Sequence, residues 1–298
     1  MESRLLQYPS RLDGANEMNI TPATRIAMIY HPIPDCLGYG GFLEHGMKQL
    51  CATEHFIPGE ETEGFDHYIY IDDGPTYYME PKYHPATYMA IDMVVKPYWY
   101  LQPIDYYYQR LLNFDNACVS STATLQYCQE RGYERVRFIA FAADPEYHKP
   151  YPVEREFPFV AVWHNCEGRI AASEQAKKQW PNGWVTWRGN ELYAESISRG
   201  KCALNWLRGN IVNMRVFEVM ATGTPLITTR HEDMEFYGLL EGEHYLGFDD
   251  GNIDQMIEQI AWVQEHQIQA MEMAARAREF VLANHTYLHR AKEILIGC

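Results

Sequence analysis

Residues 213–228 read Asn-Met-Arg-Val-Phe-Glu-Val-Met-Ala-Thr-Gly-Thr-Pro-Leu-Ile-Thr, and this stretch decides the fold. Its first part is a helical run, which Gly223 ends. Thr224 and Pro225 make the turn into an apolar strand over residues 225–229. A helix that passes through glycine to a strand end is a unit of an α/β protein, and the charges on this helix suit a polar ligand.

Arg215 and Glu218 lie three positions apart on this helix. Since a buried charge without a partner costs on the order of several kcal/mol, the pair needs another side chain or a ligand. A glutamate accepts two hydroxyl protons at once, which suits the vicinal diol of a ribose. The alternative is a surface helix with an ordinary ion pair. The neighbours favour burial, because they are apolar: Val216, Phe217, Val219, Met220 and Ala221.

The composition indicates a globular protein of one large or two ordinary domains, with 298 residues, 47% apolar and 22% charged. Residues 1–19 lack the apolar core of a signal peptide, and no apolar run approaches the ~20 residues of a membrane span. We therefore expect a soluble, cytoplasmic protein. The net charge of −15 disfavours nucleic acid and acidic membranes as partners, while it leaves room for a local basic cleft.

The seven cysteines are scattered singly, without any Cys-x-x-Cys pair. This spacing fits a reducing compartment and argues against a disulfide framework or a zinc ribbon.

Strands and helices alternate in both halves of the chain. In the first half we expect strands over 25–31, 67–71, 117–120 and 136–142, an apolar stretch over 88–95, and helices over 42–50 and 122–131, the latter capped by Thr122. Prolines within 144–158 predict a linker. In the second half we expect strands over 159–163, 184–187, 201–206, 225–229 and 245–248, and helices over 169–179, 192–198, 253–265, 268–283 and 286–296.

A glycine-rich segment, Gly38-Tyr39-Gly40-Gly41, follows the first expected strand. We expect it to be a loop that cradles a phosphate or a sugar, with Tyr39 and Gly40 on the acceptor side. It lacks both the Gly-x-Gly-x-x-Gly spacing and a Gly-Lys-Ser/Thr sequence, so a dinucleotide site or a P-loop is not indicated.

The residues from 213 to 218 and from 221 to 227 resemble those of GT-B glycosyltransferases, in the spore-maturation (CgeB-like) branch related to glycosyltransferase family 4. Residues 197–205, Asp249-Asp250 and the segment 284–290 support the resemblance, which covers most of residues 117–296. It implies two Rossmann-like domains that face each other across a cleft. Residues 1–150 would bind the acceptor, with 1–24 as a lead-in arm. Residues 151–284 would bind the nucleotide-sugar, and a helix over 285–298 would return to the first domain.

The resemblance also implies roles for single residues. Glu218 would bind the donor ribose, and the amides near Thr222 and Gly223 would approach its phosphates. Lys201 and Arg215 would neutralise the leaving diphosphate without a metal ion. Asn205 and Arg169 complete the expected nucleotide contacts.

The donor sugar would contact Asn210 and Asn213. Family 4 enzymes commonly have a glutamate eight positions before the ribose-binding one, and this chain has Asn210 there. An amide can hydrogen-bond a sugar hydroxyl but contributes no charge.

On the acceptor side, the resemblance needs a base in the first domain. Asp92 lies inside an apolar run, and either a catalytic base or a buried structural aspartate fits it. Residues 68–108 hold 11 of the 22 tyrosines, and Tyr98 and Trp99 belong to the densest group. Aromatic faces stack on sugars, so part of this group would line an acceptor groove, while the rest is ordinary packing.

Two other patterns are weak indications of a metal site. Asp72-Asp73 ends an expected strand, where a solvated turn is the simpler explanation. His285 and His289 lie four apart without a third ligand in view, so a helix start is the simpler explanation there.

The sequence therefore favours a metal-independent glycosyltransferase that moves a sugar from a nucleotide-diphosphate donor, a UDP-sugar, to a hydroxyl acceptor with possible retention of configuration. The acceptor is a glycan, a small molecule or a modified DNA base. The alternatives are a viral-type enzyme acting on hydroxymethylated DNA bases, a non-catalytic nucleotide-sugar-binding protein and a nucleotide-sugar epimerase.

Overall fold

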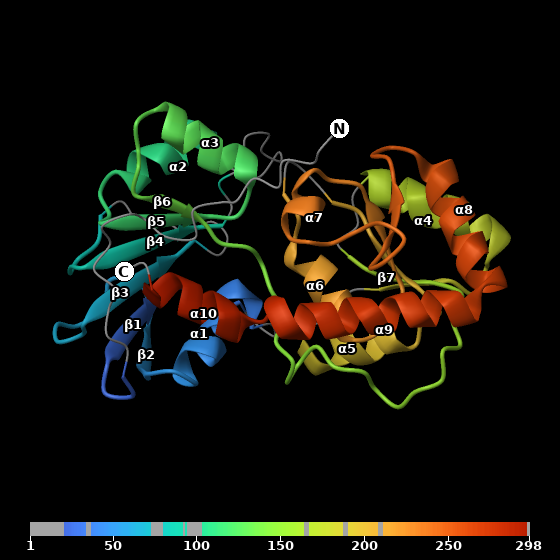
Figure 1. Cartoon of the computed structure of the whole chain (residues 1–298), viewed down its shortest axis with the longest axis horizontal. Coiled ribbons are helices and arrows are strands. Elements are labelled where there is room, and N and C mark those ends of the chain that lie inside the picture. Colours follow the sequence, from blue (N-terminus) through green and yellow to red (C-terminus); the bar gives the residue numbers. More distant parts are fainter. Residues whose placement is uncertain are drawn as a thin grey trace.

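The computed structural model describes residues 21–33, 37–72, 80–91, 93, 103–163, 167–186, 190–207 and 211–296. It is an α/β structure with two parallel sheets, one in each half of the chain (Figure 1). Within these ranges, no helix is both long enough and apolar enough to cross a bilayer.

The first sheet has six strands in the order β2-β1-β3-β4-β5-β6, all parallel. Helices α1 and α10 pack on one of its faces, and α2 and α3 lie on the other (Figure 1). Its elements are β1 (Arg25–Ile29), α1 (Gly38–Lys48), β2 (Ala52–Phe56), β3 (His67–Ile71), β4 (Ala86–Ala90), α2 (Ile104–Leu111), β5 (Asn116–Val119), α3 (Thr122–Glu130), β6 (Val136–Phe138) and α10 (Tyr287–Ile296).

The second sheet has five parallel strands in the order β11-β10-β9-β7-β8. Helices α4 and α8 share one apolar cluster with it, and α5, α6 and α9 contribute to another. Its elements are β7 (Val160–Val162), α4 (Glu167–Gln179), β8 (Trp184–Thr186), α5 (Asn190–Ser198), β9 (Ala203–Asn205), α6 (Met214–Ala221), β10 (Leu226–Thr229), α7 (Asp233–Phe236), β11 (Leu246–Phe248), α8 (Ile253–Glu265) and α9 (Gln267–Asn284).

The strand order of the second sheet reverses between β7 and β9. After β7 the chain moves outward to β8, and after β9 it moves the other way to β10 and β11. A crevice forms outside the carboxyl ends of strands at such a switch point, and this is where open α/β sheets bind ligands. The polar residues after β7, after β9 and at the start of α6 are therefore the first candidates for a site.

Two local expectations differ from the structure. The cap of α3 is Ser121, whose side chain accepts a hydrogen bond from the Thr124 amide, and Thr122 is the first helical residue. Helix α1 begins at Gly38, so the expected glycine loop forms the first turn of a helix.

The packing around Gly40 explains why glycine occupies this position of the helix. A Cβ atom built there would lie 2.5 Å from a carbon of the buried Tyr30 ring, so the ring and helix approach too closely for any larger residue.

Candidate functional site

The carboxyl ends of β9 and β10 meet the amino end of α6 in a compact polar cluster. The Asn205 amide group at the end of β9 donates to Asn213 Oδ1 at 3.2 Å and to Thr228 Oγ1 at 3.2 Å. The Asn213 amide group donates back to Asn205 Oδ1 at 3.3 Å. Asn213 precedes α6 without capping it, because its side chain turns toward Asn205. The structure therefore brings the predicted residues Asn205 and Asn213 together at the switch point.

Arg215 joins this cluster from the first turn of α6. Its Nη1 donates to Asn205 Oδ1 at 3.4 Å, and its Nε is buried without a hydrogen-bond partner among the described residues. The amino end of a helix carries a partial positive charge and amide groups that no carbonyl of the helix accepts. A guanidinium beside such a helix end can hold an anion.

Glu218 lies one turn further along α6 and is 6% exposed. Its Oε1 is 3.5 Å from Nε2 of His148. The Tyr193 hydroxyl also approaches the Glu218 carboxylate and Arg215, without forming a hydrogen bond of good geometry in the described part of the chain. Burial raises the pKa of Glu218 to about 7, against the opposing effect of the Arg215 charge. The prediction of a buried charged pair on this helix thus agrees with the structure for Glu218, while Arg215 is half-buried.

Lys201 does not join Arg215. It lies two residues before β9, at the amino end of the strand, and its amide donates to the Phe157 carbonyl at 2.8 Å. Asn205 ends the same strand at its opposite edge, so about four residues of extended chain, roughly 13 Å, separate Lys201 from the cluster. This placement does not support the predicted role of Lys201 at the diphosphate.

Thr222 and Gly223 are also at the wrong end of their helix for a phosphate. Their amides donate to carbonyls of α6, those of Glu218 and Val219 for Thr222 and that of Met220 for Gly223. The carboxyl end of a helix carries a partial negative charge, which repels phosphate. Sequence reasoning placed the glycine turn at the ligand, but the structure places it at the far edge of the sheet.

Two arginines occupy that far end of α6. Arg155 donates from Nη2 to the Gly223 carbonyl at 3.0 Å, and Arg278 donates from Nε to the Ala221 carbonyl at 3.1 Å. Cations at the carboxyl end of a helix satisfy its last carbonyls and match its dipole. They therefore hold α6 in place and leave its positive end toward the crevice.

Arg169 lies in the first turn of α4, at the same switch point as the cluster. Its Nη2 donates to the Trp206 carbonyl at 2.7 Å, and its guanidinium lies 5.6 Å from the centre of the Trp163 ring. The side chain is 7% exposed. The structure therefore brings Arg169 to the predicted edge of the sheet, where it holds the ends of β7 and β9 together.

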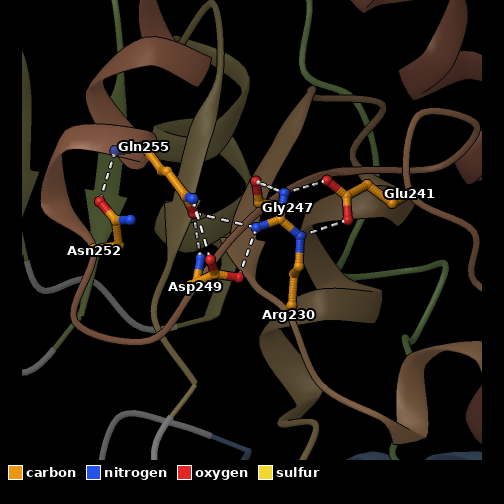
Figure 2. Close-up of polar contacts among 6 residues, drawn as sticks. All are labelled: Arg230, Glu241, Gly247, Asp249, Asn252 and Gln255. Atoms are coloured by element: carbon orange, nitrogen blue, oxygen red, sulfur yellow. Dashed lines mark hydrogen bonds and ion pairs between the residues drawn. The ribbon is translucent and has the colours of Figure 1, made fainter.

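Arg230 follows β10 at the same edge, but its charge is already paired (Figure 2). Its Nε and Nη2 form a double contact with the Glu241 carboxylate, at 2.8 and 2.7 Å. Its Nη1 donates to Asp249 at 2.8 Å, and Gln255 bridges Asp249 to the start of α8. These contacts raise the pKa of the Arg230 guanidinium. We conclude that Arg230 stabilises the edge of the sheet formed by β10 and β11 through its pairs with Glu241 and Asp249, and that its charge is not free to bind a phosphate.

The structure does not bring the predicted acceptor residues Tyr39 and Gly40 to the site. Tyr39 is 2% exposed and packs edge-on against the rings of Phe141 and Tyr287, so it belongs to the core. Gly40 is inside α1. This placement does not support the prediction that these residues cradle a sugar. Asp92, Tyr98, Trp99 and Asn210 lie outside the described residues.

The patterns that weakly suggested a metal have other roles. His285 Nε2 lies 2.9 Å from the Tyr237 carbonyl, and His289 Nδ1 lies 2.7 Å from Thr286 Oγ1. Asp72 is fully buried and accepts a hydrogen bond from the Tyr88 hydroxyl, while Asp73 lies outside the described residues. The described part of the chain contains no group of three or more His, Cys, Asp or Glu side chains that could hold a metal ion.

Sequence reasoning missed His148 and Tyr193 at the site. They lie 70 and 25 positions before Glu218, and no motif connects them to it. His148 belongs to the proline-rich linker, whose composition only predicted an irregular segment. A histidine, a chemically versatile side chain, in such a segment was the one available signal.

Comparisons with known proteins identify relatives of this fold. Residues 155–296 match the family model described as "Glycosyl transferase-like". Sucrose-phosphate synthase from Thermosynechococcus elongatus is similar in structure, with a TM-score of 0.66 and 12% identity over 91% of this chain and 97% of that chain.

WaaG, a glycosyltransferase involved in lipopolysaccharide biosynthesis, has a TM-score of 0.63 and 12% identity, over 92% of this chain and 100% of that chain. HepE from Anabaena, solved with UDP and glucose, has a TM-score of 0.61 and 10% identity, over 91% of this chain and 98% of that chain. Among curated proteins, none matches the sequence. The chain therefore has the GT-B fold, and residues 155–296, just under half of it, match a glycosyltransferase family.

Proposed function

We propose that this glycosyltransferase takes its sugar from a UDP-sugar, whose diphosphate lies against the amino end of α6, and that it transfers the sugar to a hydroxyl group without a metal ion. One observation carries the proposal. Arg215 and the first amides of α6 lie together at the switch point of the second sheet, next to Asn205 and Asn213. This is where an anionic ligand of an α/β sheet is expected.

The chemistry needs a site that tolerates growing negative charge. When the bond between the sugar and the diphosphate breaks, the leaving diphosphate gains a charge. A guanidinium and a helix dipole that are already oriented stabilise this charge without reorganising. Arg215 is held by Asn205 through Nη1, and its half-buried guanidinium lies beside the first turn of α6, which suits the role of a phosphate donor.

The ribose of the donor would lie at Glu218, one turn along α6. The carboxylate accepts hydrogen bonds from both ribose hydroxyls, which favours a ribonucleotide. UDP is the proposed nucleotide, and the similarity in fold to HepE, which was solved with UDP and glucose, agrees with this choice. Asn213 and Asn210 remain the proposed contacts of the donor sugar.

The acceptor would bind on the side of the first sheet. Asp92 remains the proposed base, and Tyr98 and Trp99 remain proposed acceptor contacts. Assignment to the spore-maturation (CgeB-like) branch and retention of configuration also remain proposals, which rest on residues 213–218 and 221–227.

A thermal-shift panel tests the donor site. UDP, GDP, ADP, dTDP and their sugar conjugates are added with and without EDTA, to the natural protein and to Glu218→Ala. A ligand that binds the folded state raises the melting temperature by mass action. We expect a shift with UDP and UDP-sugars that survives EDTA and is much smaller in Glu218→Ala. The absence of a shift with every compound contradicts the proposal, and a shift that EDTA removes contradicts metal independence.

A further inference from the structure

His148 connects the linker between the two sheets to Glu218. The ring is 4% exposed, and its Nε2 lies 3.5 Å from Glu218 Oε1. It packs between Phe42 of α1 and Tyr193 of α5, with ring centres 4.8 and 6.0 Å away. A residue of the linker thus contacts a carboxylate of the candidate donor site and a helix of the first sheet at the same time.

The hydrogen bonds of His148 decide which ring nitrogen carries the proton. The Asp144 backbone amide donates to Nδ1 at 2.9 Å, and a backbone amide can only donate, so Nδ1 is the acceptor. Burial lowers the pKa of His148 to about 3, so the ring is neutral. Its single proton is therefore on Nε2, which is the atom that faces Glu218.

The turn that carries His148 is fixed from the first domain. The His148 amide donates to the Asp144 carbonyl at 2.7 Å, which closes the turn on itself. The Asp144 carboxylate is 3% exposed and lies 2.5 Å from Nδ1 of His45 in α1. The same carboxylate accepts a hydrogen bond from the Glu146 amide at 2.9 Å. The position of Nε2 is therefore set by α1 through Asp144.

Glu218 needs such a fixed donor. A buried carboxylate can rotate and take up a proton, and either change removes lone pairs that ribose hydroxyls would use. The titratable groups that face it come from three elements: Arg215 from α6, Tyr193 from α5 and His148 from the linker. A donor at Oε1 holds the carboxylate in one orientation and favours its ionised form, while the remaining lone pairs stay available.

We propose that His148 is a positioning residue, whose Nε2–H holds the Glu218 carboxylate in the orientation that receives the ribose diol of the donor. This inference rests on the proposed donor site. It makes donor affinity depend on the linker and on the contact between Asp144 and His45. His148 itself does not touch the reacting atoms.

Two variants test the proposal. His148→Phe keeps a ring of similar size without a hydrogen-bond donor, and His148→Gln keeps a side-chain amide that reaches the Nε2 position. Affinity is measured by calorimetry for two probes, UDP and 2′,3′-dideoxy-UDP, which lacks the diol. The ratio of the two dissociation constants reports the diol contact alone, because the phosphates of the two probes titrate alike.

In the natural protein, we expect UDP to bind more tightly than the dideoxy probe. The contact of 3.5 Å between Nε2 and Oε1 is longer than an ordinary hydrogen bond, so one hydrogen bond to a charged group sets the upper bound of the effect. His148→Phe should therefore weaken UDP binding by a factor of about three to ten, and change binding of the dideoxy probe less than about twofold. His148→Gln should recover most of the loss. The pH at which the ratio falls to half should be higher in His148→Phe than in the natural protein, since Glu218 loses a donor that favours its charge.

The unchanged binding of the dideoxy probe shows that His148→Phe is folded at the nucleotide site. An equal loss for both probes, or no loss for either, overturns the role of His148. If the natural protein distinguishes the two probes and His148→Phe does so equally well, the inference fails while the proposed function stands. If the natural protein binds none of UDP, GDP and ADP, the proposed function fails, and the inference fails with it.

Discussion

Asp233 joins the two halves of the molecule by capping a helix of the other half. Its carboxylate accepts hydrogen bonds from the Thr122 amide at 3.3 Å and from the Thr122 hydroxyl, at the start of α3. Thr122 follows β5 closely and Asp233 follows β10 closely, so the carboxyl edges of the two sheets face each other at this point. Tyr237 supports the contact through its hydroxyl, which lies 3.4 Å from the Ser120 carbonyl.

Asp233→Ala should weaken this contact between the halves. It removes the acceptor for a first-turn amide, and the loss of such a helix cap costs about 0.5–2 kcal/mol. We expect the free energy of unfolding, measured by urea titration, to fall by that amount. Glu235→Ala is the matched control, because Glu235 is an exposed carboxylate on the same short helix. An equal effect of both substitutions would argue against a specific role for the contact.

Glu218→Gln should stabilise the ligand-free protein against unfolding, by an amount that depends on pH. The unfolded glutamate ionises near pH 4.5 and the folded one near pH 7, so folding is penalised above pH 4.5. The penalty grows as the pH rises to 7 and is then constant, at about 3 kcal/mol from a shift of this size. Gln keeps the shape and never ionises.

We therefore expect the variant to gain stability over the natural protein between pH 5 and pH 8, as measured by urea titration at each pH. Glu235→Gln, at an exposed position, should show no such trend. A stability difference for Glu218→Gln that stays constant over this range would show that Glu218 is not held near neutrality by burial. The same variant should bind UDP more weakly, because an amide cannot accept two hydroxyl protons as a carboxylate does.

Arg215→Met should reduce sugar transfer or donor hydrolysis by a factor of about 10²–10³ in kcat, the usual effect of removing one group that stabilises transition-state charge. Lys201→Met and Arg230→Met are controls that also remove one cation each. Lys201 lies at the amino end of β9, and the Arg230 charge is paired with Glu241 and Asp249. We expect both controls to stay within about threefold of the natural protein, well inside one order of magnitude. A large loss in Lys201→Met would restore the role that the sequence suggested for it.

Gly40→Ala should destabilise the fold without affecting nucleotide binding directly. The new methyl group would lie 2.5 Å from the buried Tyr30 ring, and such overpacking costs about 1–3 kcal/mol. Gly168→Ala is the control, in the first turn of α4, where the nearest atom is 4.0 Å away. We expect the control to be neutral or slightly stabilising. A loss of UDP affinity in Gly40→Ala at unchanged stability would instead favour a ligand loop at this place.

The sequence predicts the buried strands of this fold well. His67–Ile71 is a strand with the expected bounds, because five apolar or aromatic residues in a row suit a strand covered on both faces. The edge strand Ala52–Phe56 was missed, since it is half-exposed and lacks that pattern. The glycines of Gly38–Gly41 predict a loop, but the reason for Gly40 is the Tyr30 ring, which the local sequence does not reveal.

The site was predictable only in part. Arg215 and Glu218 stand out locally as charges among apolar neighbours. The sequence does not show which end of α6 faces the crevice, so it also predicts a phosphate site at the glycine turn, which lies at the carboxyl end of the helix. His148 could not be assigned, because its role depends on a contact across 70 positions with Glu218. Residues that act through such long-range contacts need the fold before their function can be inferred.

The most direct measurement of the central claim is a crystal structure of the protein with UDP bound. We expect the diphosphate at the amino end of α6, within hydrogen-bond distance of the Arg215 guanidinium and the first amides of the helix, and both ribose hydroxyls on Glu218. Diphosphate density at the other end of the helix, beside Gly223, or in the first half of the chain would contradict it.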